Sequence, residues 1–306
     1  MIEVAIMIEG QNGLNWDRWR RIAGAVEQLG FVGLYRSDHF TNSRPPDTDS
    51  LELWVSLTWL AANSQRLEFG PLVSPVSFRH PAMTARVASA VDDLSGGRLN
   101  LGLGAGWQER EHEMFGMDLL ELDQRFQRFE EGLEVVSRLL SSDQPVSFEG
   151  RYYRLRDAKL LPGPRRPGGP PIVVGGNGRQ RTLPLAARFA SEWNAVFLSR
   201  GKFVALNAHL DELLRANGRQ PSSVRRSMML GTLFGRDEAE MHRKADGRDL
   251  AELRAGGVVC GPPAAAVEQL LALAEAGVQR VMLQWLDLDD IDGLERMANS
   301  VLTRLG

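Results

Sequence analysis

The segment LEFGPLVSPVSFRHPAMTARVASAVDDLSGGRLNLGLGAGWQEREHE, residues 67–113, decides the fold. Residues 67–73 are short and apolar and predict a buried strand, and residues 99–103 predict a second one. After Pro81, apolar residues recur at helical spacing, namely Met83, Val87, Ala90, Val91 and Leu94. A strand–helix–strand unit of this length has parallel strands, because only a crossover connection returns the chain in the same direction.

The same alternation runs along most of the chain. Further strands are predicted at residues 3–8, 31–35, 172–174, 193–198, 227–234 and 278–283, with helical patterns between them. Eight alternating strands favour a (β/α)8 TIM barrel, and a doubly wound open sheet is the alternative. We expect residues 1–306 to form a single domain. Residues 114–170, after the fourth strand, are interpreted as an insertion that contains a long charged helical region and a hairpin at 146–155.

Composition excludes several classes of function. The net charge is -3, so the basic surface of a nucleic-acid-binding protein is not expected. No apolar run approaches the roughly 20 residues that cross a bilayer, so no membrane partner is expected. The start of the chain does not resemble a signal peptide, and the lone Cys260 excludes an internal disulfide. These features predict a cytoplasmic location.

The loops at the carboxyl ends of barrel strands carry the active site in this fold, so we looked there for chemistry. Asp38 and His39 follow the second predicted strand. A histidine exchanges protons near neutral pH, and a carboxylate beside it tunes or orients it. Adjacent strand residues point to opposite faces, however, so the two side chains need not touch. The alternative is a polar cap at the strand end.

Two glycine-rich loops follow the fourth and fifth predicted strands. Gly102, Gly104 and Gly106 do not match the dinucleotide pattern GxGxxG, but their missing side chains let a flat ring lie against the backbone. Residues 175–179, GGNGR, open a helix whose free N–H groups, with Arg179 or Arg181, are suited to an anion such as phosphate. Ordinary tight turns are the alternative for both loops.

Six segments together resemble the luciferase-like monooxygenase superfamily over nearly the whole chain: SDHF, LVSPVSFRHP, LSGGRLNLGLGAGWQEREHEMFG, VSFEGRYYRL, PIVVGGNGRQRT and GVQRVMLQ. The branch that the chain most resembles contains oxidoreductases that use the deazaflavin coenzyme F420. Relatives that depend on flavin mononucleotide (FMN) share the same skeleton. The resemblance therefore implies a luciferase-like TIM barrel, F420 as cofactor, and FMN as the alternative.

The resemblance also implies roles for individual residues. Asp38 and His39 match a catalytic pair beside the cofactor ring, with the histidine as proton donor or electrostatic partner. A non-proline cis peptide is expected between Leu72 and Val73, behind the ring, with Ser74 at the polar edge of the ring. The residues expected to flank the cofactor side chain are Ala105, Gly106, Trp107 and Glu111. Those expected to hold its phosphate are Gly175, Gly176, Asn177, Gly178 and Arg179.

One position departs from the family pattern. Relatives that oxidise a sugar phosphate carry an acidic residue where this chain has Trp107, so a sugar phosphate is not the expected substrate. His39 remains the leading candidate for proton transfer, ahead of Glu109 and Glu111. No metal site is expected, because the spacing of the remaining histidines matches no zinc or iron site, and His112 is expected on an exposed helix face.

The predicted function is hydride transfer between C5 of the deazaflavin and an unidentified small organic substrate. The alternatives are an FMN-dependent monooxygenase and a non-catalytic (deaza)flavin-binding protein. A lyase or isomerase of the phosphate-binding barrel type is less favoured, because those barrels hold phosphate after strands seven and eight. The resemblance further implies a homodimer, in which four residues form either the dimer surface or core: Trp54, Leu57, Trp59 and Leu60.

Overall fold

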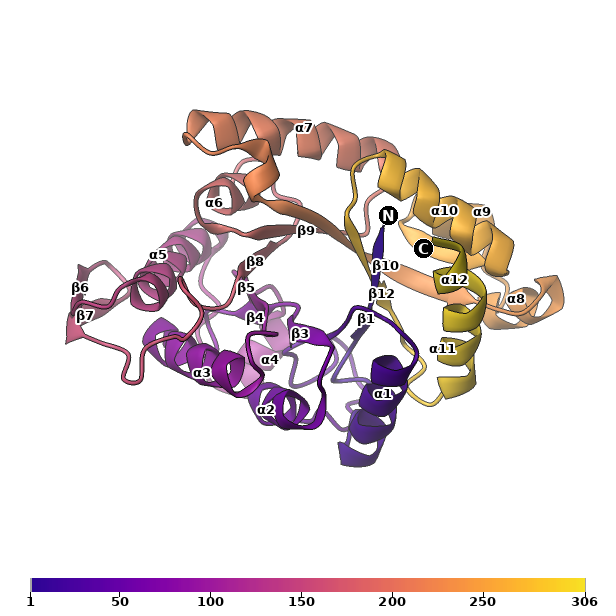
Figure 1. Cartoon of the computed structure of the whole chain (residues 1–306), viewed down its shortest axis with the longest axis horizontal. Helices are drawn as coiled ribbons and strands as arrows, with labels where there is room; N and C mark the ends of the chain where they lie inside the picture. The colour runs from indigo at the N-terminus through magenta and orange to yellow at the C-terminus, as the bar shows by residue number, and fades with distance from the viewer. Residues whose placement is uncertain (1, 306) are drawn as a thin grey trace.

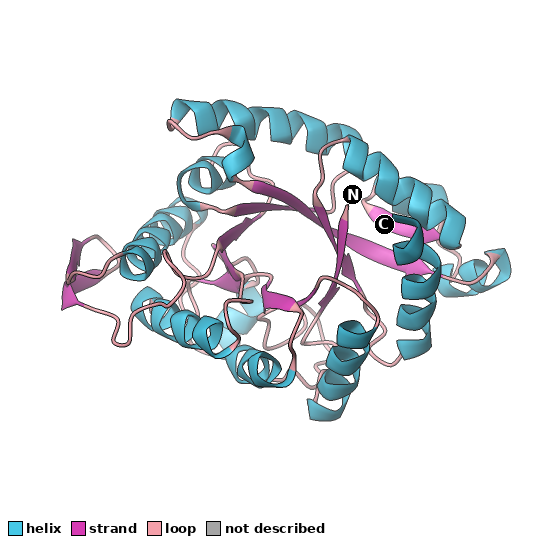
Figure 2. Ribbon diagram, viewed as in Figure 1, coloured by secondary structure: helices cyan, strands magenta, loops and turns pink. Residues whose placement is uncertain are grey.

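A ring of parallel strands forms the centre of the molecule, and helices surround it (Figures 1 and 2). The computed structural model describes residues 2–305. Neighbouring strands follow the order β3–β2–β1–β12–β10–β9–β8–β5–β4, and a bridge between Phe69 of β3 and Leu99, just before β5, closes the ring. The ring strands are β1 (Glu3–Ile8), β2 (Gly33–Arg36), β3 (Glu68–Pro71), β4 (Ser74–Pro75), β5 (Leu101–Gly104), β8 (Ile172–Gly175), β9 (Glu192–Val196), β10 (Arg225–Phe234) and β12 (Arg280–Gln284). The predicted (β/α)8 barrel is confirmed, and the open-sheet alternative is wrong.

Helices follow the strands along the chain and lie outside the ring. The longer helices are α1 (Trp16–Gln28), α2 (Leu53–Asn63), α3 (Pro81–Leu94), α5 (Leu122–Ser141), α6 (Thr182–Phe189), α7 (Arg200–Ala216) and α10 (Pro263–Glu275). The shorter segments are α4 (Glu109–Met114), α8 (Glu238–Ala245), α9 (Leu250–Ala255), α11 (Ile291–Met297), α12 (Thr303–Leu305), a 3₁₀ turn at Pro221–Ser223 and a π-helical turn at Ala298–Leu302. Within residues 2–305, none of these helices combines the length and the apolar character needed to cross a bilayer.

Local sequence accounts for the ends of α3. Pro81 occupies the first turn, where its missing N–H costs no hydrogen bond, and the ring of His80 accepts the backbone N–H of Ala82 at 3.3 Å. After the last turn, Gly96 and Gly97 adopt φ values of +71° and +89°. Glycine reaches this left-handed region without strain, so the helix ends where the sequence predicts.

The third barrel strand is interrupted, which its apolar pattern did not predict. It divides into β3 and β4, and the peptide between Leu72 and Val73 is cis, as the resemblance implies. The interruption places Val73 against the bare backbone of β5 and β8. A Cβ atom on Gly104 would lie 2.6 Å from Cγ2 of Val73, and one on Gly102 would lie 2.0 Å from the carbonyl oxygen of Pro71. Glycine on β5 therefore makes room for this bulge, and not only for a ligand.

Two segments differ from the sequence prediction. The helical region predicted from residue 114 is broken before Leu122, where Gly116 and Leu120 have positive φ values, and the continuous helix is α5. The sequence prediction missed a short strand, β11 (Val258–Gly261), which pairs with the carboxyl-terminal part of β10. Four residues are too few to show a clear apolar pattern. The hairpin predicted at 146–155 is present as β6 (Val146–Glu149) and β7 (Arg154–Ala158).

The predicted insertion, residues 114–170, contributes in two ways. Its helix α5 packs against α3 and α6 and takes a place in the outer ring, whereas the β6–β7 hairpin lies outside it (Figure 1). The boundaries of a single domain with this insertion stay a prediction, and residues 1 and 306 lie outside the described residues.

The α2 residues considered for a dimer surface belong mostly to the core. Trp54, Leu57 and Leu60 are buried, and Trp59 packs edge-on against Trp16 at 6.3 Å between ring centroids. The core alternative therefore holds for the first three, and the homodimer stays a prediction.

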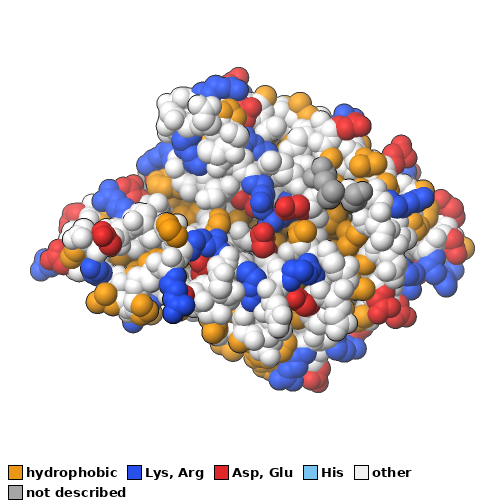
Figure 3. All heavy atoms as spheres, viewed as in Figure 1, with side chains coloured by type: hydrophobic (Ala, Val, Ile, Leu, Met, Phe, Trp, Pro, Cys, Tyr) orange, Lys and Arg blue, Asp and Glu red, His pale blue; other side chains and the backbone are white. Residues whose placement is uncertain are grey.

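A buried ionic cluster fills the amino-terminal end of the barrel. The guanidinium of Arg280 is fully buried and donates to Glu3 at 2.7 Å and to the hydroxyl of Tyr35 at 2.8 Å. Glu68 lies 2.8 Å from the same group. Charged side chains accordingly gather over the centre of the face shown in Figure 3. A buried charge persists only when it is paired and hydrogen-bonded, so this cluster holds the amino-terminal ends of β1, β3 and β12 together.

We predict that Gly102→Ala lowers the free energy of unfolding by about 2–4 kcal/mol, because the added Cβ meets backbone that cannot move aside. The matched control is Gly24→Ala on the exposed face of α1, where a Cβ meets nothing within 4 Å. That change is expected to be neutral or stabilising, since alanine favours a helix. Thermal unfolding of both variants tests this, and equal stability of the two would contradict the packing described.

Candidate active site

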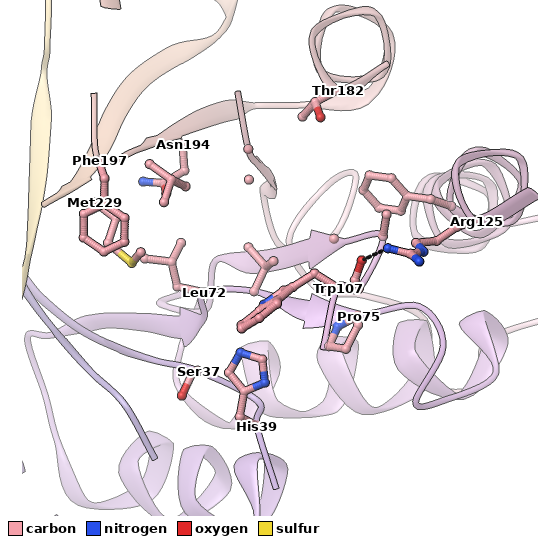
Figure 4. Close-up of a pocket in the computed structure, with 18 of the residues that line it drawn as sticks. Ser37, His39, Leu72, Pro75, Trp107, Arg125, Thr182, Asn194, Phe197 and Met229 are labelled. Atoms are coloured by element: carbon pink, nitrogen blue, oxygen red, sulfur yellow. Dashed lines mark hydrogen bonds between the residues drawn. The ribbon is translucent and has the colours of Figure 1, made fainter. Parts of the chain in front are cut away.

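The carboxyl ends of the strands open into a cavity of about 650 Å³, a volume typical of cofactor sites. Figure 4 shows side chains from several strands and from α5 around it. The predicted site residues that line the cavity are His39, Leu72, Val73, Ala105, Gly106, Trp107, Glu111, Gly175 and Gly176. The predicted site residues outside its lining are Asp38, Ser74, Asn177, Gly178 and Arg179.

A buried carboxylate from α4 holds His39 in place. Nδ1 of His39 lies 2.8 Å from Oε1 of Glu111, and Oε2 of Glu111 accepts the backbone N–H of Phe40 at 3.0 Å. The side chain of Glu111 is only 1% exposed, whereas that of His39 is 18% exposed. A carboxylate in this position keeps a proton on Nδ1 and fixes the ring, so Nε2 is the nitrogen left to exchange a proton.

Glu111 also sets the pKa of His39. Burial by itself lowers this pKa, but the hydrogen bond and the negative charge of Glu111 outweigh burial, with smaller contributions from Glu9 and Asp38. The net result is a pKa above the ordinary value of 6.5. His39 therefore holds its proton to higher pH than a free histidine, because its charged form is stabilised by a partner that is itself enclosed.

Asp38 faces a different set of partners. Its carboxylate accepts the hydroxyl of Ser74 at 2.7 Å and forms an ion pair with Arg79, which also donates to Glu52 at 2.9 Å. Burial raises the pKa of Asp38, and Arg79 and Ser74 offset part of that effect. Asp38 thus ties the second strand to the loop after β4, and it does not share the cavity with His39.

The side-chain amide of Asn177 holds the loop after β8 in place. Asn177 pairs with the backbone of Val196, donating to its carbonyl at 2.7 Å and accepting its N–H at 2.9 Å. Gly176 has a φ of +125°, which favours glycine, and its carbonyl accepts the indole N–H of Trp193 at 2.9 Å. Gly175 and Gly176 line the cavity, whereas the side chain of Arg179 is exposed outside it.

A cation missed by the sequence reasoning also lines the cavity. Arg125 lines the cavity from the first turns of α5 and donates to the carbonyls of Gly106, at 3.3 Å, and Leu120, at 3.0 Å (Figure 4). Thr182, at the start of α6, lines the same region. The sequence did carry a sign of Arg125, because it interrupts the apolar helical stripe of Leu122, Phe126 and Phe129, whose members also line the cavity.

The remaining aromatic and histidine residues have distinct surroundings. Trp107 is 61% exposed and meets His39 edge-on at 5.4 Å between ring centroids. His112 is buried, which corrects the expected exposed position: its ring nitrogens pair with the carbonyl of Gln108 at 2.7 Å and the hydroxyl of Ser77 at 2.8 Å. Among residues 2–305, no cluster of His, Cys, Asp and Glu is arranged to hold a metal ion.

The cavity fits a flat ring with an anionic tail. Bare backbone at Gly104, Gly106, Gly175 and Gly176 forms one region of its wall, and a Cβ on Gly104 would meet Val73 at 2.6 Å. Apolar side chains supply the surface for a ring: Met7, Leu72, Val73, Val196 and Met229. The guanidinium of Arg125 suits a phosphate. The N–H of Gly176 is donated to the carbonyl of Asn194 at 2.9 Å, which corrects the expectation that this loop offers it to an anion.

This combination of a closed parallel barrel and a glycine-walled cavity defines a TIM-barrel enzyme with a site at its carboxyl end. Residues 2–257 match the family described as luciferase-like monooxygenase. The chain belongs to that family, which confirms the predicted resemblance and the prediction of an enzyme.

Three known proteins illustrate the relationship. An F420-dependent hydroxymycolic acid dehydrogenase of Mycobacterium tuberculosis is 30% identical over 273 residues, 88% of this chain and 71% of that protein. An FMNH2-dependent dimethylsulfone monooxygenase of Pseudomonas putida is 28% identical over 210 residues, 69% of this chain and 56% of that protein. A solved F420-dependent secondary alcohol dehydrogenase, in complex with an F420–acetone adduct, superposes with a TM-score of 0.86 over 98% of both chains at 16% identity. This last likeness shows the fold.

We predict that Glu111→Gln lowers the pKa of His39, because it removes the charge that favours the imidazolium. An NMR titration of the His39 ring protons measures this. The control is Glu113→Gln on the same helix, an exposed residue whose replacement is expected to leave that pKa unchanged. An unchanged pKa in Glu111→Gln would contradict the pairing.

The same substitution has a pH-dependent effect on stability. Folding raises the pKa of His39, so the stabilisation from Glu111 is fully present below about pH 6.5 and is lost as the pH rises through the folded-state pKa. The stability difference between wild type and Glu111→Gln is therefore expected to be larger at about pH 5 than at about pH 9.

Proposed function

We propose that this protein is a coenzyme F420-dependent oxidoreductase that moves a hydride between C5 of the deazaflavin and a small organic substrate. The observation that carries the proposal is a cavity that combines a glycine-walled ring site with a histidine whose proton is controlled by Glu111. The F420-dependent relative, aligned over 88% of this chain, supports the choice of cofactor.

The cofactor is held from three directions in this proposal. Leu72 and Val73 support the ring from behind, and Ala105, Gly106 and Trp107 flank its side chain. Gly175 and Gly176 place bare backbone, without side chains, against the phosphate, and Arg125 and Thr182, which the sequence reasoning missed, complete that end. A bound deazaflavin supplies a ring carbon that accepts or gives a hydride, which is the redox chemistry that side chains lack.

His39 carries the proton that accompanies the hydride. When an alcohol is oxidised, Nε2 of His39 takes the hydroxyl proton as the hydride leaves carbon; in the reverse direction it returns that proton to the carbonyl oxygen. Glu111 positions the ring and stabilises the charged form through Nδ1. Asp38 lies outside the cavity, so we assign it and Ser74 a positioning role through Arg79, in place of direct proton transfer.

In this proposal, three further residues act without touching the ligand: Asn177, Gly178 and Arg179. Asn177 fixes the glycine loop to β9 through two hydrogen bonds. A Cβ on Gly178 would lie 2.8 Å from the hydroxyl oxygen of Thr182, so glycine there lets the loop close on α6. Arg179 contributes long-range positive charge from outside the cavity.

An FMN-dependent monooxygenase is the second candidate. The FMNH2-dependent relative shows that the family also includes flavin enzymes, and the same phosphate end suits FMN. A non-catalytic ring-binding protein is less well supported, because His39 and Glu111 form an enclosed proton-exchanging pair at the cavity wall. The substrate is small and organic in each enzymatic case.

Parallel titration with F420 and FMN, followed by the shift of their absorption spectra, tests the proposed cofactor. We expect saturable binding of F420 with higher affinity than FMN. Tighter binding of FMN would favour the monooxygenase, and binding of neither would contradict the proposal.

The same titration tests the phosphate end. We predict that Arg125→Gln weakens F420 binding about tenfold or more, because one charge-assisted hydrogen bond contributes roughly 1.5–3 kcal/mol. The matched control, Arg179→Gln, is expected to weaken it less than about threefold, since that side chain is exposed and the energy of exposed charges is small. The reverse order would show that the loop arginine, and not the α5 arginine, holds the phosphate.

A further inference from the structure

A buried amide at the wall of the cavity has one oxygen that the protein leaves without a partner. Asn194, on β9, lines the cavity and is 1% exposed. Within residues 2–305, no group donates a hydrogen bond to its Oδ1. A buried carbonyl in this condition is destabilising until a donor reaches it, and such atoms are uncommon in folded proteins.

The neighbours of Asn194 fix which way its amide points. Nδ2 donates to the hydroxyl oxygen of Ser227 at 2.9 Å and to the sulfur of Met282 at 3.3 Å. Ser227 gives its own proton to the carbonyl of Trp193, at 3.4 Å, so its oxygen is left as an acceptor. A flipped amide would set Oδ1 against the sulfur of Met282, which has no proton to donate. Oδ1 of Asn194 is therefore the atom that has no hydrogen-bond donor.

The surroundings define the group that this oxygen takes. Figure 4 shows Asn194 with Phe197 and Met229 on the side of the cavity away from Arg125 and Thr182. Glu9, an acidic residue that also lines the cavity, already accepts Gln11 at 3.0 Å and Gln284 at 2.7 Å. A neutral amide oxygen among apolar side chains accepts from an uncharged N–H or O–H and gives nothing to a carbonyl.

We propose that Asn194 is a specificity residue whose Oδ1 accepts a hydrogen bond from an uncharged N–H or O–H of the bound ligand, at the wall of the cavity that β9 forms. This inference rests on the proposed function and names the ligand chemistry of the same site. Two sources meet the requirement: the imide N–H of the cofactor ring, and a hydroxyl of the substrate. A ketone in place of that hydroxyl leaves the oxygen unpartnered.

The experiment compares wild type with Asn194→Leu, which removes the acceptor and keeps the branching of the side chain at Cγ. Asn63→Leu is the matched control, because it makes the same change at an exposed residue of α2 that does not line the cavity. Ser227→Ala is the second test variant; it keeps Asn194 but releases the amide from its acceptor. Circular dichroism and thermal unfolding show that each variant is folded.

The first arm measures the dissociation constant of F420 and of its tail-free ring. The second arm compares the binding of cyclohexanol with that of cyclohexanone by ligand-detected NMR, with and without F420. An imide contact predicts about tenfold weaker binding of both rings to Asn194→Leu, the equivalent of 1.4 kcal/mol. A substrate contact predicts unchanged ring binding and loss of a wild-type preference for the alcohol. Ser227→Ala is expected to show the same loss in part, and Asn63→Leu neither loss.

The outcomes separate this inference from the proposed function. If wild type binds F420, and Asn194→Leu changes neither ring affinity nor the alcohol preference, the assignment of Asn194 is overturned and the proposed function stands. If wild type binds no F420, the proposed function fails. The alcohol comparison without cofactor then still decides whether Asn194 selects a donor.

Discussion

The packing of Val73 against bare backbone is the constraint on which the site depends. The interruption of the third strand sends this side chain toward β5 and β8. A Cβ atom on Gly102, Gly104 or Gly175 would lie within about 3 Å of a methyl carbon of Val73, so only glycine leaves room for it. Two of these glycines, Gly104 and Gly175, also leave part of the cavity wall without side chains. Val73, which supports the ring, and the glycine wall, which leaves room for the ring, therefore depend on the same packing arrangement. A side chain at these glycine positions would displace Val73 and would also fill the space for the ring.

The two ends of the barrel use charge in opposite ways. At the amino-terminal end, Arg280 is fully buried among carboxylates and the hydroxyl of Tyr35, and this cluster fills the interior. At the carboxyl end, Glu111 is buried but its partner His39 is partly exposed to the cavity. A cluster of buried ion pairs holds structure in place, whereas a pair with one accessible nitrogen is able to exchange a proton.

Much of the fold and part of the site were predictable from the sequence. The eight strands were found because their apolar runs alternate with helical periodicity, and the caps of α3 because Pro81 and Gly96–Gly97 have local conformational requirements. The residues beside the cavity were found where a motif sits at a strand end, as with His39 and Gly176. Arg125 and Asn194 were missed because each lies within an otherwise regular helix or strand.

The sequence by itself determined the order of strands and helices, the barrel they form and the family to which the chain belongs, because these follow from local periodicity and motif spacing. Only the tertiary structure decided which side chains meet: that Glu111, 72 positions from His39, holds its ring, and that Asp38 turns to Arg79 instead. Such contacts depend on how distant strand ends come together around the barrel. No spacing along the chain encodes that arrangement.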